Sequence, residues 1–499
     1  MKANQINDKL MLILQDNKDC DFGMGRDFRY IKIVNGFRYL CPVSGYDDLA
    51  PLIELTTRIG ETGIYTSHQL IGYSLTSGTT GVPRYIPCTQ KHVEDYKKEF
   101  LDIVENERTM LLLESLPRNR KFTDDVYLDS ISGIMLQSLK KKFKQLNIVN
   151  PEPLVYINED IDSEYLRAFF ALKDASITQI FAPFCWGVVN FFDVIRNNWD
   201  TLLNDIGKGS IDPSVKMPEE LRNKLEEYIK PEAKRAEELR ALYNGEFFAG
   251  AWVEKVWPKM KRVIAGGSGS FSIYARRMKR HLGNIVHNNG LYAASEGVIG
   301  RALKDGSDIY TLADNSLFLE FLPVNGGSVE PLLADELEKG RDYRVIVTNN
   351  SGLYRYQMGD VIRVTDNKDG VPEFKIAYRE AQTVTICDTL ITEEDIFEAV
   401  CAIEDKTGIA VADYTFGAED DMCRIFLEPE EDADNMKRFS DVSLDEITET
   451  VQRSLQKKNT VIKCRILISE PQTQLLYRDQ RRYREITALD QIKPVRLLD

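Results

Sequence analysis

The 499-residue chain has few of the residues that build disulfide frameworks or metal centres, with only eight cysteines and four histidines. The cysteines run from Cys20 to Cys464 and form no CxxC pair. That pattern is typical of reduced, mostly buried thiols rather than of a disulfide framework. The histidines match no zinc-ligand spacing. We therefore expect a reducing, cytoplasmic setting and no structural metal held by the protein alone.

The chain also lacks long apolar runs and an excess of basic charge. Its formal net charge is −14 and no long basic tract occurs, which argues against binding to nucleic acids or anionic membranes. The longest nearly uncharged stretch, residues 177–192, is too short to span a membrane and contains Pro183 and Gly187. The first residues have no apolar signal core. The sequence predicts a cytoplasmic monomer that binds neither nucleic acid nor membrane.

Helical and strand-like patterns alternate through the first three quarters of the chain. Residues 91–107 have helical periodicity, and residues 219–243 form a second helical stretch interrupted at Pro231. Short apolar runs such as residues 262–265 and 343–348 are typical of strands. Because 499 residues exceed one compact core, this alternation predicts an α/β protein with a substantial sheet and more than one domain.

The sequence changes character near residue 380. Thr392 is a suitable N-cap for a new helix that begins at Glu393, and acidic loops follow, which are typical of a solvated face. We place the boundary between a large N-terminal domain, residues 1–382, and a small C-terminal domain, residues 383–499.

The most informative segment is residues 73–84, Tyr-Ser-Leu-Thr-Ser-Gly-Thr-Thr-Gly-Val-Pro-Arg. Its two glycines free the backbone to present N–H donors, its hydroxyl side chains add more, and Arg84 adds a charged fork, a combination suited to holding nucleotide phosphates. The spacing is not that of a Walker A loop, and the alternative is a flexible Ser/Thr/Gly linker. The residues of this loop predicted to bind the nucleotide are Thr76, Ser77, Gly78, Thr79, Thr80 and Gly81.

The loop resembles the signature Thr-Ser-Gly-Thr-Thr-Gly-x-Pro-Lys/Arg of the adenylate-forming superfamily of acyl-CoA ligases, peptide-synthetase adenylation domains and luciferases. Three further segments resemble the motifs of one branch, the Gretchen Hagen (auxin-responsive) acyl-acid amido synthetases of plants and their bacterial relatives. They are Leu-Tyr-Ala-Ala-Ser-Glu-Gly at 291–297, Gly-Leu-Tyr-Arg-Tyr-Gln-Met-Gly-Asp-Val at 352–361 and Asp-Gln-Ile-Lys-Pro-Val-Arg at 490–496. The motifs occur in the family's order over nearly the whole chain, which therefore resembles a bacterial-type member.

The resemblance implies a fold and roles for particular residues. It implies a large N-terminal adenylate-forming domain, with β-sheets, packed helices and a β-barrel-like part, and a small mobile α+β C-terminal domain. Glu296 would ligate Mg²⁺, which prefers carboxylate oxygen, and Asp360 would accept hydrogen bonds from the ribose hydroxyls. Lys493 would reach the α-phosphate and the substrate carboxylate. Each residue also has a simpler interpretation. Glu296 could be a solvated acid in a turn, Asp360 could start a strand, and Lys493 could be a solvated tail residue.

Weaker motif matches complete the predicted nucleotide site. Glycine pairs also occur in plain turns, an aromatic cluster also builds cores, and a lone arginine also lies on surfaces. The remaining residues assigned to nucleotide binding by resemblance are Gly266, Gly267, Ser268, Tyr292, Ala293, Ser295, Tyr354 and Arg379.

The resemblance implies that ATP, with Mg²⁺, activates a carboxylic acid as an acyl-AMP and that an amine, typically of an amino acid, then takes the acyl group. Lys493, Glu296 and Arg84 would be catalytic. The alternatives are an acyl-CoA ligase with the same first step and an inactive nucleotide-binding homologue. The chain departs from the family pattern at Arg84, where the superfamily usually has lysine, and before Thr392, where a Glu-Lys pair is missing. Residues 106–129, where relatives shape the acyl pocket, match no known motif, so the acid is not predicted.

Overall fold

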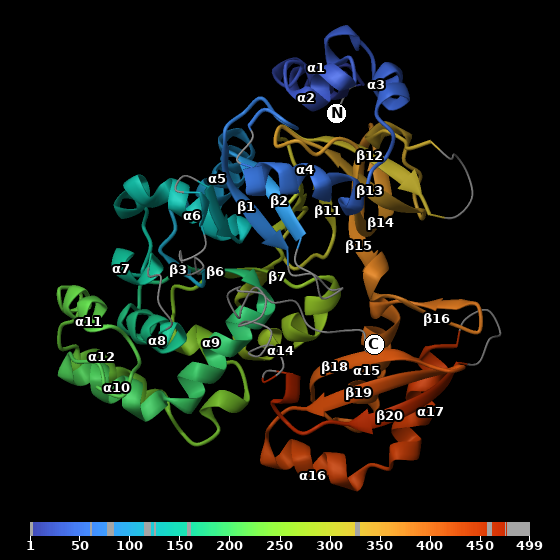
Figure 1. The fold of residues 1–499 in the computed structure, drawn as a ribbon. Helices are drawn as coiled ribbons and strands as arrows, with labels where there is room; N and C mark the ends of the chain where they lie inside the picture. Colours follow the sequence, from blue (N-terminus) through green and yellow to red (C-terminus); the bar gives the residue numbers. More distant parts are fainter. Residues whose placement is uncertain are drawn as a thin grey trace.

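The protein is described here from a computed structural model that has two unequal parts, an N-terminal part that ends near residue 380 and a C-terminal part built on its own sheet (Figure 1). The structure describes residues 3–59, 62–76, 84–113, 121–123, 126–156, 161–324, 330–456, 462–474 and 476. Within these ranges, no helix combines the length and apolarity that a bilayer crossing requires.

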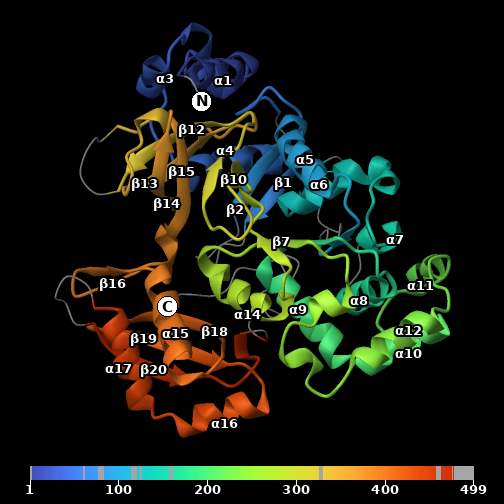
Figure 2. The same cartoon turned by 180° about the vertical axis from the view of Figure 1, so that it is seen from behind.

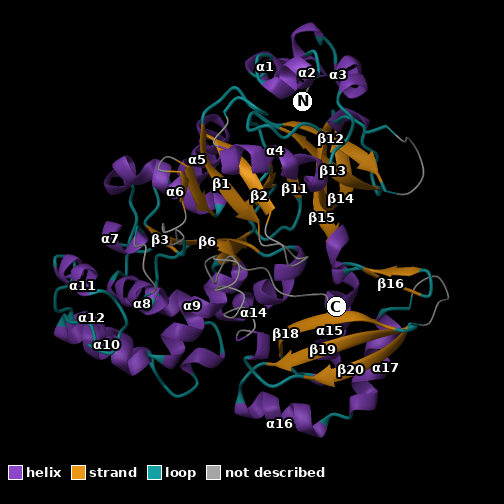
Figure 3. Ribbon diagram, in the orientation of Figure 1, coloured by secondary structure: helices purple, strands orange, loops and turns teal. Residues whose placement is uncertain are grey.

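Helices cover the sheets of the N-terminal part (Figure 3). Most are short, and their apolar faces pack into the cores beneath the sheets. The helices are α1 (Ala3–Asp16), α2 (Asp21–Gly25), α3 (Val34–Leu40), α4 (Tyr46–Ile59), α5 (Gln90–Val104), α6 (Ile131–Leu139), α7 (Glu152–Val155), α8 (Ser163–Lys173), α9 (Cys185–Asn197), α10 (Trp199–Lys208), α11 (Glu219–Glu226), α12 (Ala233–Leu242), α13 (Val253–Val256) and α14 (Ser272–Leu282).

Two of these helical regions test the sequence patterns directly. The helix expected at 91–107 is confirmed as α5, which begins after the N-cap Thr89 and ends earlier, at Val104. The early end has a local cause, because Asn106 has φ 62°, a left-handed conformation that helices do not continue through. The break expected at Pro231 is also confirmed, since it separates α11 from α12.

The described residues of the N-terminal part form three sheets. A four-stranded sheet has the order β2-β1-β5-β4, a second four-stranded sheet is wholly parallel with the order β3-β6-β7-β8, and a seven-stranded antiparallel sheet has the order β12-β13-β14-β15-β11-β10-β9. The strands are β1 (Leu70–Thr76), β2 (Arg84–Thr89), β3 (Thr109–Leu111), β4 (Lys121–Thr123), β5 (Val126–Asp129), β6 (Gln179–Phe184), β7 (Arg262–Gly266), β8 (Val286–Asn288), β9 (Leu291–Ala294), β10 (Gly297–Ala302), β11 (Tyr310–Leu312), β12 (Phe318–Pro323), β13 (Asp342–Thr348), β14 (Tyr356–Lys368) and β15 (Val371–Arg379).

The seven-stranded sheet is the nearest counterpart of the expected barrel-like part. In the described residues it has two edges, at β12 and β9. Its pairing places Asp360 of β14 opposite Arg379 of β15, and the β9–β10 hairpin ends at Ala294 and Gly297. The second and third predicted motifs meet directly, because the Tyr292 hydroxyl of β9 donates to Asp360 of β14.

The C-terminal part follows a 3₁₀ turn at Glu380–Gln382. Its three-stranded sheet has the order β18-β19-β20, and helices lie along it. Its elements are β16 (Val384–Ile386), β17 (Thr389–Ile391), α15 (Glu393–Thr407), β18 (Val411–Glu419), β19 (Met422–Pro429), α16 (Ala433–Asp441), α17 (Leu444–Ser454) and β20 (Lys463–Ile468). Thr392 caps α15, as predicted, through a capping box with Asp395. The expected fold class, a large α/β N-terminal domain with a smaller α+β one, is confirmed.

Helix α14 is one of the N-terminal elements against which the C-terminal part packs. In both views it lies between helices α10–α12 on one side and the C-terminal sheet on the other (Figure 1, Figure 2). One hydrophobic cluster includes Ile273 and Met278 of α14 together with Val411 and Tyr414 of β18. The two parts therefore share a core in this arrangement.

Candidate active site

A single large cavity brings together most of the predicted site residues that the structure describes. Its volume is about 1410 Å³, and its wall includes segments of β1, β2, β7, β9, β14, β15 and α15. The predicted residues that line it are Thr76, Arg84, Gly266, Gly267, Ser268, Tyr292, Ala293, Ser295, Glu296, Asp360 and Arg379.

The phosphate loop begins and ends at this cavity. Thr76, the last residue of β1, pairs with Arg84, the first residue of β2. The Arg84 guanidinium carbon lies 5.5 Å from the centre of the Tyr46 ring, a distance suited to a cation–π contact. Arg84 is thus a cation held at the cavity wall by an aromatic ring.

The glycine turn after β7 packs too closely to admit a side chain. The Gly267 N–H donates to Asn289 Oδ1 at 2.8 Å, and a Cβ on Gly267 would lie 2.7 Å from Ala275 Cβ and 2.9 Å from Cys185 Sγ. Such a close approach leaves glycine as the residue that fits. The turn presents backbone rather than side chain to the cavity.

Asp360 of β14 is held by Arg379 of the adjacent strand β15 and by Tyr292 of the edge strand β9. Arg379 Nε donates to Asp360 Oδ1 at 2.6 Å and Tyr292 OH donates to Asp360 Oδ2 at 2.9 Å. Burial and the adjacent carboxylate raise the pKa of Tyr292 well above its usual range, so the hydroxyl keeps its proton. Burial acts to lower the pKa of Arg379, but Asp360 outweighs it and the net pKa is raised. Asp360 therefore accepts from a cationic and a neutral donor at the cavity wall.

The two residues between β9 and β10 are Ser295 and Glu296. The hydroxyls of Ser295 and Ser74 lie 2.7 Å apart, which ties this turn to the strand that leads into the phosphate loop. Glu296 lines the cavity and is only 7% exposed.

The donor set at Glu296 fits a magnesium ion shared with a substrate. No group of three or more His, Cys, Asp or Glu side chains able to hold a metal occurs in the described part of the chain. Mg²⁺ is commonly held by one or two protein carboxylates together with substrate phosphates. Glu296, which lines the same cavity as Thr76 and Arg84 at the two ends of the phosphate loop, matches that arrangement.

Not every predicted residue reaches the cavity. Tyr354 lies in the neighbouring core, where its ring stacks on Phe22 with centroids 4.8 Å apart and its hydroxyl donates to the Tyr65 carbonyl at 2.9 Å. These contacts account for its full burial. Ser77, Gly78, Thr79, Thr80, Gly81 and Lys493 lie outside the described residues.

The motifs did not reveal the apolar side of the cavity. It is lined by Tyr96 and Phe100 of α5, Met135 of α6, Phe181 of β6 and Leu291 of β9. The available signal was helical spacing, since Tyr96 and Phe100 are four residues apart on one face of α5. A surface of this kind suits the apolar portion of an acid.

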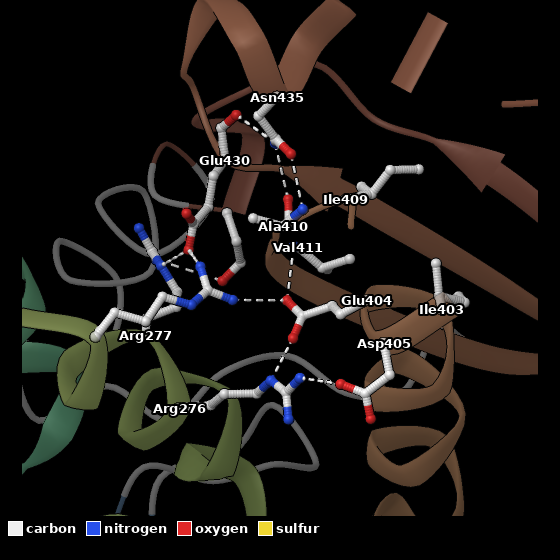
Figure 4. Close-up of polar contacts among 12 residues, drawn as sticks. Arg276, Arg277, Ile403, Glu404, Asp405, Ile409, Ala410, Val411, Glu430 and Asn435 are labelled. Atoms are coloured by element: carbon white, nitrogen blue, oxygen red, sulfur yellow. Dashed lines mark hydrogen bonds and ion pairs between the residues drawn. The ribbon is translucent and has the colours of Figure 1, made fainter. Parts of the chain in front are cut away.

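On another side of the cavity, where Arg276 of α14 and residues of α15 lie, ion pairs join α14 to the C-terminal part (Figure 4). Glu404 of α15 is paired with Arg276 and, at 3.0 Å, with Arg280. Arg280 also contacts Glu430 at 2.8 Å. Arg277 meets the same carboxylate at 2.9 Å. We refer to Arg276, Arg277, Arg280, Glu404 and Glu430 as the α14 ion-pair cluster.

Comparison with known proteins gives matches over most of the chain. A family model described as the GH3 family N-terminal domain matches residues 1–286, and one described as the GH3 family central domain matches residues 310–379. A probable indole-3-acetic acid-amido synthetase, GH3.9 of Oryza sativa subsp. japonica, is 28% identical over 288 residues, which cover 55% of this chain and 65% of that protein. The indole-3-acetic acid-amido synthetase GH3.2 of Arabidopsis thaliana is 24% identical over 429 residues, or 77% of this chain and 75% of that protein.

The fold is shared with solved structures. The GH3.15 acyl acid amido synthetase superposes with a TM-score of 0.83 at 19% identity, covering 100% of this chain and 91% of that chain. A 2-hydroxyisobutyryl-CoA ligase in the postadenylation state gives a TM-score of 0.61 at 12% identity, covering 100% of this chain and 90% of that chain. The chain thus shares the fold of these two enzymes.

Proposed function

The chain belongs to the GH3 family, and we propose that it is a ligase that activates a carboxylic acid with ATP and transfers the acyl group to an amine. The supporting observation is the convergence of Glu296, the Asp360–Arg379 pair and Arg84 on one cavity. These residues lie far apart in the sequence, and each has a chemical property that adenylation requires. The apolar side of the cavity supplies room for the acid.

In the first half-reaction, a carboxylate oxygen of the acid attacks the α-phosphorus of ATP and the bond to pyrophosphate breaks. Because negative charge crowds the reacting centre, catalysis depends mainly on positioning and charge neutralisation. Asp360 accepts hydrogen bonds from the ribose hydroxyls. Arg84 binds the departing phosphates, and Lys493 neutralises charge on the α-phosphate. Glu296 would hold Mg²⁺, which when bound supplies positive charge to the phosphate oxygens.

In the second half-reaction, the amine attacks the acyl carbon, AMP leaves and the amine gives up a proton. An amino acid is the proposed acceptor, since the GH3.2 relative is an amido synthetase by name. We propose that the C-terminal domain, residues 383–499, changes orientation between the two steps. That movement requires the α14 ion-pair cluster to separate.

We further propose that the enzyme acts as a monomer in the cytoplasm. The eight cysteines are all free and most are buried, which suits a reducing compartment.

ATP–pyrophosphate exchange with a panel of aryl, indolyl, fatty and amino acids, with Mg²⁺ present, tests this proposal. We expect exchange that depends on one class of acid and is lost in Lys493→Ala, while that variant still binds ATP. Supplying amino acids or coenzyme A next then identifies the acceptor, and thioester formation alone would assign an acyl-CoA ligase instead. If the protein binds ATP but catalyses no exchange with any acid, it is an inactive nucleotide-binding homologue and the proposal fails.

A further inference from the structure

The turn that carries Glu296 is held by side chains at three consecutive backbone carbonyls. The Tyr96 hydroxyl donates to the Ala294 carbonyl, and His92 Nε2 donates to the Ser295 carbonyl at 3.0 Å. Asn349 Nδ2 donates to the Glu296 carbonyl at 2.9 Å. All three donor residues are buried, with exposed fractions of 6%, 2% and 0% respectively.

The backbone of this turn has a reason to need such support. Ala294 pairs with Gly297, so Ser295 and Glu296 form a two-residue hairpin loop. The favoured two-residue loops have positive φ at one or both positions, and they match the strand twist for that reason. Neither Ser295 nor Glu296 has a positive φ. The turn therefore does not have the backbone conformation that favours a two-residue loop, and the hydrogen bonds from His92, Tyr96 and Asn349 stabilise it instead.

The donors are arranged to stay neutral and in place. His92 and Tyr96 are one helical turn apart on α5, and their rings meet edge to face with centroids 5.2 Å apart. Burial lowers the pKa of His92 and raises the pKa of Tyr96 well above its usual range. Since a carbonyl can only accept, the His92 proton lies on Nε2.

The third donor is tied to the same helix. Asn349 Oδ1 accepts from the Ser351 N–H at 2.9 Å, and the Ser351 hydroxyl accepts from the N–H of Thr89, the N-cap of α5, at 3.0 Å. The start of α5 and Asn349 therefore form one hydrogen-bonded unit beneath the turn.

We propose that His92, Tyr96 and Asn349 are positioning residues that hold the β9–β10 turn so that the Glu296 carboxylate faces the nucleotide phosphates and their metal ion. This inference rests on the proposed function, in which Glu296 is the metal ligand. Partners outside the ligand sphere typically change metal affinity or activity by about 10–100-fold when removed. A merely structural role would instead lower stability and leave metal affinity unchanged.

The test is a titration of Mn²⁺ into the full-length protein with a non-hydrolysable ATP analogue and no acid, followed by water-proton relaxation. Tyr96→Phe and His92→Leu each remove one donor, and His92→Gln restores an amide donor near the position of Nε2. Tyr156→Phe is the matched control, because its hydroxyl also donates to a carbonyl, that of Leu136 at 3.0 Å, but does not line the cavity.

We expect Mn²⁺ affinity to fall about tenfold in Tyr96→Phe and His92→Leu. His92→Gln should recover most of the loss, and Tyr156→Phe should match the parent protein. Equal Mn²⁺ affinity in all folded variants would overturn the inference. If the variants show the expected ranking of Mn²⁺ affinities while the parent protein catalyses no pyrophosphate exchange, that result would support the positioning role and contradict the proposed catalysis. A parent protein that binds no Mn²⁺ with the analogue would remove both.

Discussion

The two walls of the cavity are held in place by different kinds of interaction. On the β9–β10 side, neutral donors that are almost fully buried hold successive carbonyls. On the α14 side, charged pairs hold the C-terminal part, and although Glu404 is 3% exposed its partners Arg276 and Arg280 are each 35% exposed.

The difference indicates which wall stays fixed. Breaking a buried neutral hydrogen bond leaves an unsatisfied group at a cost of about 1–3 kcal/mol and offers water no easy replacement. Half-exposed guanidinium groups are solvated again as soon as they separate from their carboxylates, so the net cost of parting is smaller. The fixed wall therefore carries the carboxylate proposed to hold the metal, and the separable wall carries the domain proposed to move.

The largest effect should come from the fixed wall, at Glu296 itself. Glu296→Gln keeps the size of the side chain but removes the charge that would hold Mg²⁺. We expect acid-dependent pyrophosphate exchange to fall about 10²–10³-fold, as for other lost electrostatic contacts to a reacting centre. Thermal denaturation should show a Tm close to that of the parent.

A useful comparison is Asp335→Asn, which changes an acid in the 3₁₀ turn at Ala334–Glu336 that does not line the cavity. Its exchange rate should equal that of the parent. An equal loss in both variants, or no loss in Glu296→Gln, would separate Glu296 from the chemistry.

Much of the fixed wall could be predicted from the sequence. Short motifs identified Glu296, Asp360 and the glycine turn because each needs a particular residue type at a particular place in a strand or turn. Strand pairing then explains why Asp360 meets Arg379, since the two are cross-strand neighbours. The α/β class and the helix after Thr392 followed from periodicity and capping.

The supports of both walls could not be predicted. His92, Tyr96 and Asn349 act through hydrogen bonds to backbone carbonyls. Every residue has a backbone carbonyl, so the sequence does not indicate which carbonyl accepts. The arginines of α14 match no motif, and their partners lie more than 120 residues away in the sequence. Tyr354 shows the converse, because a motif position can be used for packing rather than for ligand contact.

Acid should act next on the N-terminal part, because all four histidines lie there and burial also lowers the pKa of His281 on α14. Burial lowers the pKa of His92 and of His287, which donates to the Ala265 carbonyl at 2.9 Å. Below about pH 6.5 the unfolded chain takes up protons that the folded chain does not, so stability falls as pH falls. We expect a loss of about 1.4 kcal/mol per histidine per pH unit at most, measured by urea unfolding at pH 7.5, 6.5 and 5.5.

The Glu428 carboxyl acts in the opposite sense, because burial raises its pKa. His92→Gln isolates the histidine contribution, since it keeps a donor and cannot titrate. Its stability should change less between pH 6.5 and 5.5 than that of the parent. Parallel curves for the two proteins would show that His92 is protonated equally in both states.

The smallest effect should follow from the separable wall. Glu404→Gln removes the carboxylate charge that faces Arg276 and Arg280 while keeping a group able to accept from the Val411 N–H, a bond now 3.0 Å long. Because both arginines remain partly hydrated, we expect a loss of about 1–2 kcal/mol in the free energy of unfolding. Pyrophosphate exchange should change less than in Glu296→Gln, because Glu404 does not line the cavity.

Glu449→Gln is the matched control for that charge change. Glu449 pairs with Arg453 at 2.9 Å on the surface of α17, where an exposed pair stabilises by about 0.3–0.5 kcal/mol. Added salt should reduce the difference in stability between the parent and Glu404→Gln, since screening weakens pairs that water can reach. If instead Glu404→Gln abolished exchange as fully as Glu296→Gln, the α14 ion-pair cluster would belong to the catalytic geometry and the two walls would not differ in kind.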